Sequence, residues 1–338
     1  MAASFDDARL EDPDVLGVFD SWLRPLAQSG ARLRRAAAMA DDALEGLGAE
    51  GLPRAVIAFG PEARLVRAVL EPTCPVPFVA WPRLGLPSWV GSLDTVVALG
   101  GTGGTVDQLA AAAEATRRGA RIVVACPPEG DLARASASRS TTLLPVDEDP
   151  LSTAIVAVEA LARMGLGPGL DLAAVAQAMD DVAVESSARA DIAQNPAKAV
   201  ALELAETEPL VWGGSILAAR ASRRVAEALR RASGRTVLSA DADVLLPLLA
   251  RAQRRDVFAD PFDESPADCR PALVIVDDGL GDDLSADENR RLRTEAAAHE
   301  LRVSHLECAS GDRVQRYVTL LLKGQFAAAY LRAGLEDI

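Results

Sequence analysis

Short apolar runs alternate with longer amphipathic stretches along the first half of the chain. The apolar runs predict strands at 54–59, 76–81, 95–99 and 121–125. Helical spacing of apolar positions, together with glycine and proline at the breaks, predicts helices at 62–70 and 106–118. Strands that alternate with helices at this spacing indicate a parallel, doubly wound sheet of the α/β class.

The second half repeats this order of elements. Predicted strands at 210–212, 236–238, 272–276 and 301–306 and helices at 216–232 and 286–299 match the elements of the first half one by one. We therefore expect two tandem domains, 1–165 with N-terminal helices and 166–338 with a C-terminal helix. Each is predicted to be a flavodoxin-like three-layer α/β/α domain, and residues 172–206 form a helical linker. The last helix, 314–331, is apolar and could pack on either copy or on a second subunit.

A turn made only of glycine and threonine follows the strand at 95–99. In open parallel sheets ligands bind beyond the carboxyl ends of the strands, and free N–H groups at a helix N-terminus attract phosphate. Thr105 with Gln108 has the form of a capping box, which makes Thr105 the expected N-cap. The predicted anion site consists of Gly60, Gly100, Gly101, Thr102, Gly103, Gly104 and Thr105. A plain tight turn explains the same glycines, because every doubly wound domain needs glycine where strands turn into helices.

The corresponding loop of the second copy, 277–283, is acidic. Its four aspartates would repel phosphate, so any anion is expected at the first copy. The loop is interpreted as a solvated turn in preference to a divalent metal site. Ser285 with Glu288 is predicted to cap the following helix, and His305 is interpreted as a core histidine, not a catalytic base.

Other ligand classes find little support. The glycine run does not fit Gly-x-Gly-x-x-Gly, and no Gly-Lys-[Ser/Thr] occurs, so nucleotide binding is disfavoured. With only two histidines we expect no metal site, and we expect no cofactor. The net charge is −14, with more acids than bases in both halves, which argues against nucleic acid. No apolar run is long enough to span a membrane, and the N-terminus lacks the apolar core of a signal peptide. Four widely spaced cysteines are typical of reduced thiols, so we expect a cytoplasmic protein.

Several segments together resemble the double sugar isomerase (SIS) domain proteins of the bifunctional phosphoglucose/phosphomannose isomerase family. The similar segments are 76–77 with 87–90, the strand and loop 95–105, 118–120, 130–133, 144–150, the linker motif Asn195-Pro196-Ala197-Lys198, and 322–331. The resemblance implies two SIS domains, a homodimer, and binding of a phosphorylated sugar or a similar small anion at the loop 100–105.

The departures from the family pattern fall on functional positions. Where the family loop resembles Ser-x-Ser-Gly-x-Thr, this chain has Gly100-Gly101-Thr102-Gly103-Gly104-Thr105. The family's Gly-Gly-Ser turn is Gly60-Pro61-Glu62, and its active-site Pro-Arg is Pro150-Leu151. The segment that would carry the catalytic glutamate, 252–262, contains neither glutamate nor histidine, and Asp256 is the nearest acid.

Three functions follow from this comparison. The first is a phosphosugar-binding protein without turnover, acting as a sensor or as a partner of sugar-phosphate enzymes. The second is an active aldose–ketose isomerase that converts glucose 6-phosphate or mannose 6-phosphate to fructose 6-phosphate with Asp256 as base. The third is a structural module that interacts through a surface such as helix 314–331.

Overall fold

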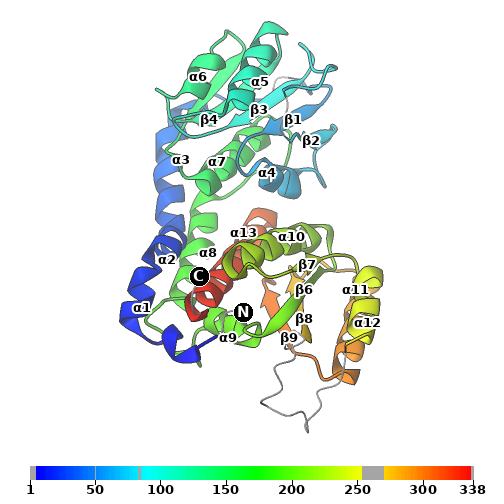
Figure 1. Cartoon of the computed structure of the whole chain (residues 1–338). Helices are drawn as coiled ribbons and strands as arrows, with labels where there is room; N and C mark the ends of the chain where they lie inside the picture. The colour runs from blue at the N-terminus through cyan, green and yellow to red at the C-terminus, as the bar shows by residue number, and fades with distance from the viewer. Residues whose placement is uncertain (1–4, 50, 83–84, 253–269, 336–338) are drawn as a thin grey trace. The chain divides into compact units, whose positions relative to one another are not determined.

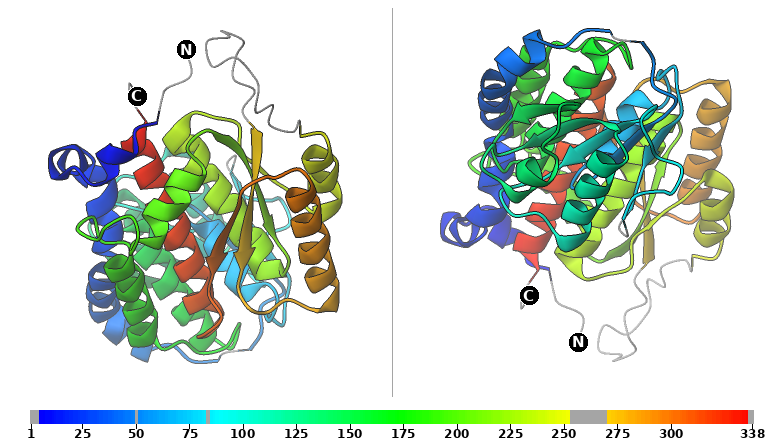
Figure 2. Two further views of the ribbon diagram at one scale, coloured as in Figure 1. Left: turned by 90° about the horizontal axis from the view of Figure 1, so that it is seen from below. Right: turned by 90° about the horizontal axis from the view of Figure 1, so that it is seen from above.

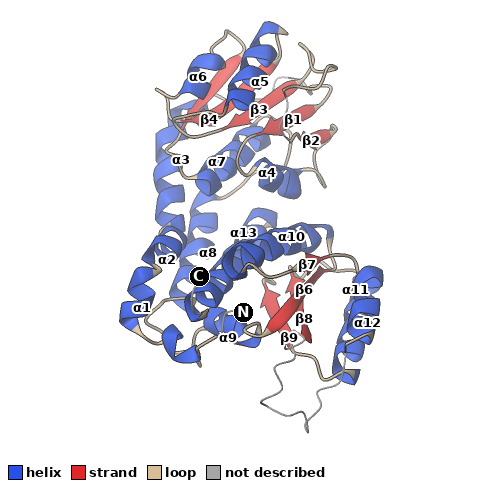
Figure 3. Cartoon of the chain, viewed as in Figure 1, coloured by secondary structure: helices blue, strands red, loops and turns tan. Residues whose placement is uncertain are grey.

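The computed structural model describes residues 5–49, 51–82, 85–252 and 270–335 of the chain. Their contacts divide the chain into two compact units, residues 29–177 and residues 1–28 with 178–338. We call the first the five-stranded unit and the second the four-stranded unit, after their sheets. Figure 1 labels the elements, and Figure 3 shows that each sheet is flanked by helices.

All strands of the five-stranded unit are parallel. Their order is β2-β1-β3-β4-β5, so the chain order reverses between β1 and β3. The strands are β1 (Val56–Phe59), β2 (Phe78–Ala80), β3 (Thr95–Leu99), β4 (Arg121–Cys126) and β5 (Thr141–Pro145). The helices are α3 (Ser29–Glu45), α4 (Ala63–Leu70), α5 (Val106–Arg117), α6 (Asp131–Ala135) and α7 (Pro150–Arg163).

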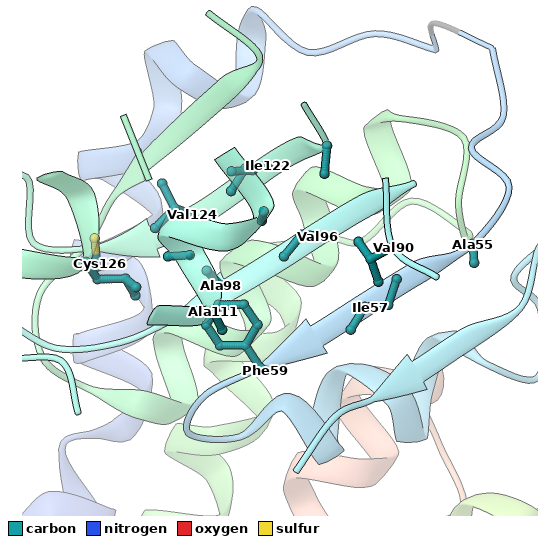
Figure 4. Close-up of a cluster of buried hydrophobic side chains, with 14 residues drawn as sticks. Ala55, Ile57, Phe59, Val90, Val96, Ala98, Ala111, Ile122, Val124 and Cys126 are labelled. Atoms are coloured by element: carbon teal, nitrogen blue, oxygen red, sulfur yellow. The ribbon is translucent and has the colours of Figure 1, made fainter. Parts of the chain in front are cut away.

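Alternating side chains of the strands build one core on each face of this sheet. On one face Ile57, Val96 and Ile122 pack beneath the small side chains of α5 (Figure 4). Helices α3, α4 and α7 cover the opposite face. The central strands are buried on both faces, which explains their continuous apolar sequence.

The four-stranded unit repeats this topology with the order β7-β6-β8-β9. Its strands are β6 (Thr207–Gly213), β7 (Leu238–Ser239), β8 (Arg270–Asp277) and β9 (Val303–Glu307). Helices α11 (Ala242–Ala250) and α12 (Asp283–Ala298) cover one face. Helices α9 (Pro196–Glu203), α10 (Ile216–Ser233) and α13 (Arg313–Gly334) lie on the other. Helix α8 (Leu172–Glu185) precedes α9.

The N-terminal residues join the four-stranded unit. The short helices η1 (Asp7–Leu10), α1 (Pro13–Val18) and α2 (Asp20–Ala27) form this segment. Both views in Figure 2 show it beside α13, and the Asp6 N–H donates to the carbonyl of Gly334 (2.9 Å). The sequence grouped these residues with the first domain, whereas their contacts join the two ends of the chain.

Two local expectations are corrected. Helix α12 begins three residues earlier than predicted, because Asp282 and not Ser285 is its N-cap, and Ser285 occupies the third helical position of the capping box. His305 is exposed on β9, with Nδ1 3.3 Å from a carboxylate oxygen of Glu307, so the expectation of a core histidine is wrong.

Helix α13 is almost entirely buried within its own unit, against α9 and α10. The predicted helix 314–331 therefore packs on the second copy. None of the described helices is long and apolar enough to cross a membrane.

Candidate functional site

Two turns meet at the point of the five-stranded sheet where strand order reverses. Gly60 follows β1 and Gly100 follows β3, and these strands are direct neighbours. Gly60 has φ +104°, and a Cβ placed there would lie 1.9 Å from the carbonyl oxygen of Leu99. Only glycine fits this approach, so the sheet itself brings the predicted site residues Gly60 and Gly100 together.

The glycine–threonine loop is fixed at its beginning and end. The Gly100 N–H donates to the carbonyl of Ala125 (3.1 Å), which continues the ladder towards β4. The Thr102 carbonyl accepts from the N–H of Asp131 (3.0 Å) at the start of α6. These two contacts tie a loop with four glycines to β4 and α6.

Thr105 is the N-cap of α5, as predicted. Its hydroxyl accepts from the Gln108 N–H (3.3 Å), and its own N–H donates to the Gln108 side chain (2.9 Å). Within the described residues the N–H groups of Gly103 and Gly104 have no hydrogen-bond partner. Thr102, Gly103 and Thr105 are exposed, so these donors and the positive end of the α5 dipole are open to solvent.

Glu148 is part of this loop's surroundings and was not among the site residues predicted from the sequence. Its Oε1 accepts from the Thr102 N–H (3.0 Å). Hydrogen bonds from the side chain and backbone of Thr102 lower the pKa of the Glu148 carboxyl below its usual range. The position could have been noticed, because the acidic run 147–149 follows strand β5 and the carboxyl ends of parallel strands share one edge.

The equivalent edge of the four-stranded unit is closed by acidic side chains. Ser215 caps α10 and donates to Asp278 (2.5 Å), whose other oxygen accepts from the Leu280 N–H (3.0 Å). Asp277 accepts from the Gly279 N–H (2.8 Å), and Asp282 caps α12. Hydrogen bonds from Ser285 lower the pKa of Asp282. These carboxylates occupy the loop's donors and carry negative charge, which makes an anion site here unfavourable.

A cavity of about 230 Å³ lies beside these acids, lined by Trp212, Ser215, Asp277 and Asn289 among others. No three His, Cys, Asp or Glu side chains in the described part of the chain are arranged to hold a metal ion.

The linker motif holds the segment that precedes α9. Asn195 caps α9 through the N–H groups of Ala197 (3.0 Å) and Lys198 (3.1 Å). Lys198 is fully buried, and its ammonium donates to the carbonyls of Ala188 (3.0 Å) and Ala190 (2.7 Å). Burial lowers the pKa of Lys198. The motif therefore fixes the path of the chain, and beside it lies a cavity of about 780 Å³ within the four-stranded unit.

The candidate base Asp256 lies outside the described residues, so its role stays a prediction. Leu151, in place of the family's arginine, lies in the first turn of α7. The remaining predicted site residues, Gly60 and Gly100 to Thr105, lie at one edge of one sheet.

No protein-family model and no curated relative matches this sequence. Solved structures match nearly the whole chain. The fold is that of the SIS proteins. The C-terminal domain of glucosamine-fructose-6-phosphate aminotransferase from Francisella tularensis matches with a TM-score of 0.60 and 12% identity, over 93% of this chain and 96% of that one.

Two further matches are enzymes by their descriptions. Tagatose-6-phosphate ketose/aldose isomerase from Escherichia coli has a TM-score of 0.55 and 12% identity, over 96% of this chain and 92% of that one. Glucosamine-6-phosphate deaminase from Thermotoga maritima has a TM-score of 0.53 and 15% identity, over 92% and 93%. At such identities the likeness establishes the fold, and the resemblance to the phosphoglucose/phosphomannose isomerase branch stays a prediction.

Proposed function

We propose that this protein binds a phosphorylated sugar through the glycine–threonine loop without converting it, as a cytoplasmic sensor or as a partner of sugar-phosphate enzymes. The observation that carries the proposal is the loop itself. It lies at the strand-order reversal, its N–H groups at Gly103 and Gly104 are unpaired within the described residues, and it leads into a capped helix. Similar folds in proteins named for sugar-phosphate chemistry support the choice of ligand.

The residues at the positions of the family's base and arginine argue against turnover. Moving a proton between C1 and C2 of a sugar phosphate requires a base, and losing a general base reduces rates about 10²–10⁴-fold. The segment that resembles the family's catalytic glutamate segment has no glutamate, and the arginine position is Leu151. We further propose a homodimer, as in the family that the sequence resembles.

The structural-module alternative finds less support than ligand binding. The helix that was considered as its surface, α13, is buried in the core of the four-stranded unit and presents few side chains to a partner.

The test is a binding titration combined with an activity assay. Glucose 6-phosphate, mannose 6-phosphate and fructose 6-phosphate are titrated calorimetrically, and interconversion is followed in a coupled assay. We expect at least one ligand to bind and none to be converted. Turnover that disappears in Asp256→Asn would support the isomerase instead, and lack of binding by all three would refute phosphosugar binding.

Thr102→Val tests whether the ligand binds at the glycine–threonine loop. Removing one hydroxyl donor to a charged oxygen is expected to weaken binding about tenfold. Thr294→Val is the matched control, because Thr294 is an exposed threonine of the four-stranded unit whose hydroxyl bonds only to the Arg290 carbonyl (2.8 Å). Equal affinity of Thr102→Val and the control would place the ligand elsewhere.

A further inference from the structure

The loop that we propose for anion binding already contacts an anion from its own chain. Oε1 of Glu148 accepts a hydrogen bond from the N–H of Thr102 (3.0 Å), and Thr102 lowers the pKa of this carboxyl. One of the donors that a phosphate would use is thus occupied by Glu148. Gly101 faces the same carboxylate, since a Cβ placed there would lie 3.7 Å from Oε1.

The neighbouring basic side chains are engaged with other acids. Arg35 of α3 pairs with Asp147 (2.7 Å), and Arg32 pairs with Asp149 (3.2 Å). Asp131 of α6, close to the loop, pairs with Arg134. Glu148 therefore differs from the two aspartates beside it, because it accepts a hydrogen bond from the loop whereas they pair with arginines.

Glu148 is also free to leave. It is exposed, and it lies between Val146, at the end of the β5 region, and Pro150, where α7 begins. A side chain in this position can rotate into solvent without uncovering any core, so displacement costs the loop contact and little else.

We propose that Glu148 is an internal competitor for the anion site, and that its carboxylate sets the affinity of the loop for phosphate-bearing ligands. This inference rests on the proposed function, because it concerns the same loop. A ligand phosphate and the Glu148 carboxylate cannot both bind Thr102. Every anionic ligand must first displace Glu148, which lowers its apparent affinity by the fraction of time that the loop is free.

Competition and simple charge repulsion predict different patterns. A competitor reduces the affinity of all anions by the same factor, since the loop has to be freed for each of them. Repulsion by a nearby charge would instead affect a doubly charged ligand more than a singly charged one. Glucose 6-phosphate and glucose 6-sulfate separate the two, because they have similar shapes and the sulfate ester carries one negative charge.

The experiment compares wild type, Glu148→Gln and Glu148→Ala by calorimetry at pH 7.5. Substitution is preferable to acidification, because the sequence pI is about 4.7 and the protein would approach zero net charge as Glu148 is protonated. Glutamine keeps a neutral acceptor for the Thr102 N–H, whereas alanine removes it. We expect both ligands to bind about tenfold more tightly to Glu148→Ala, by a similar factor, with Glu148→Gln in between.

Glu129→Gln is the control for charge. Glu129 is exposed and lies two residues before Asp131, whose N–H donates to the Thr102 carbonyl (3.0 Å), so it is an acidic residue close in sequence to a contact of the loop and has no hydrogen bond to Thr102 within the described residues. We expect its affinities to match wild type. Thermal melting of each variant confirms that the fold is intact.

A larger gain in affinity for glucose 6-phosphate than for glucose 6-sulfate would assign the effect of Glu148 to charge repulsion, and two further results would overturn the proposal. If wild type binds the ligands and Glu148→Ala binds them with unchanged affinity, the role of Glu148 is wrong and the proposed function stands. Absence of binding by wild type and Glu148→Ala alike would overturn both this inference and the proposed function, because the loop would then be free and still bind nothing.

Discussion

At the scale of single residues, the structure of the loop depends on its glycines and on the contact with Glu148. Gly60 allows the turn after β1 to approach Leu99 at the end of β3, and the N–H groups of Gly103 and Gly104 have no hydrogen-bond partner within the described residues. Glu148 reaches the N–H of Thr102 in the same loop from another strand end. The sequence indicates the glycines directly, whereas the contact with Glu148 depends on the order of strands in the sheet.

Gly60→Ala tests the approach of the two turns. The added Cβ would meet the Leu99 carbonyl at 1.9 Å from a backbone with φ +104°, so we expect unfolding of the five-stranded unit to become easier by about 3 kcal/mol. Urea denaturation measures the change.

Gly103→Ala is the matched control in the same region. A Cβ at Gly103 meets nothing within 4 Å, and its φ is not positive, so its effect should stay within about 0.5 kcal/mol. Equal stabilities of the two variants would contradict the close approach at Gly60.

At the scale of elements, α13 illustrates how a buried helix is held by polar contacts at its surface. Tyr330 on α13 is fully buried, and its hydroxyl donates to the Ser186 carbonyl (2.7 Å) just after α8. Its ring lies under the Lys198 ammonium, 5.5 Å from the ring centroid. The spacing of apolar residues predicted α13. The partner of the Tyr330 hydroxyl, Ser186, lies more than a hundred residues away in the sequence and could not be predicted in this way.

Alkaline pH is expected to weaken this attachment. Burial raises the pKa of Tyr330 to about 12, above the value of 10.0 expected in the unfolded chain. The folded state therefore holds the phenolic proton more tightly than the unfolded chain does. The contribution of Tyr330 to the free energy of unfolding is complete below pH 10 and is lost as pH rises towards 12. The total loss amounts to about 3 kcal/mol.

Tyr330→Phe isolates the effect. The variant should lose about 1 kcal/mol at neutral pH with the hydrogen bond, and its stability should fall less steeply than that of wild type between pH 10 and 12. Lys198, whose pKa is lowered, makes stability change with pH in the opposite direction, but it is present in both proteins. Parallel pH profiles in urea denaturation would contradict the assignment.

At the scale of the whole molecule, two copies of one topology have diverged at the same edge. In the five-stranded unit one glutamate contacts the glycine–threonine loop, and in the four-stranded unit three aspartates take the loop and cap positions. The grouping of the ends also differs from the repeat, since residues 1–28 complete the four-stranded unit. Sequence repeats indicate elements, but contacts between the ends decide which unit each belongs to.

Leu10→Ala tests this grouping. Leu10 in η1 has no exposed surface, and η1 packs against α13. Removing its side chain should destabilise the four-stranded unit by about 2–5 kcal/mol. Amide hydrogen exchange followed by mass spectrometry should show faster exchange in α13 and unchanged exchange in β1 to β5. Faster exchange in the five-stranded unit instead would support the grouping of the N-terminal helices with the first domain that the sequence predicted.

The sequence by itself determined the class of the fold and the place of the glycine–threonine loop. Apolar periodicity and glycine positions are local properties of the chain, and they indicated β3, α5 and the Thr105 cap. It did not predict strand β5 or helix α6, because the run 141–145 is half polar and the helix has only five residues. Strand order, the contact of Glu148 with Thr102 and the placement of residues 1–28 were decided by the tertiary structure, since each depends on residues far apart in sequence.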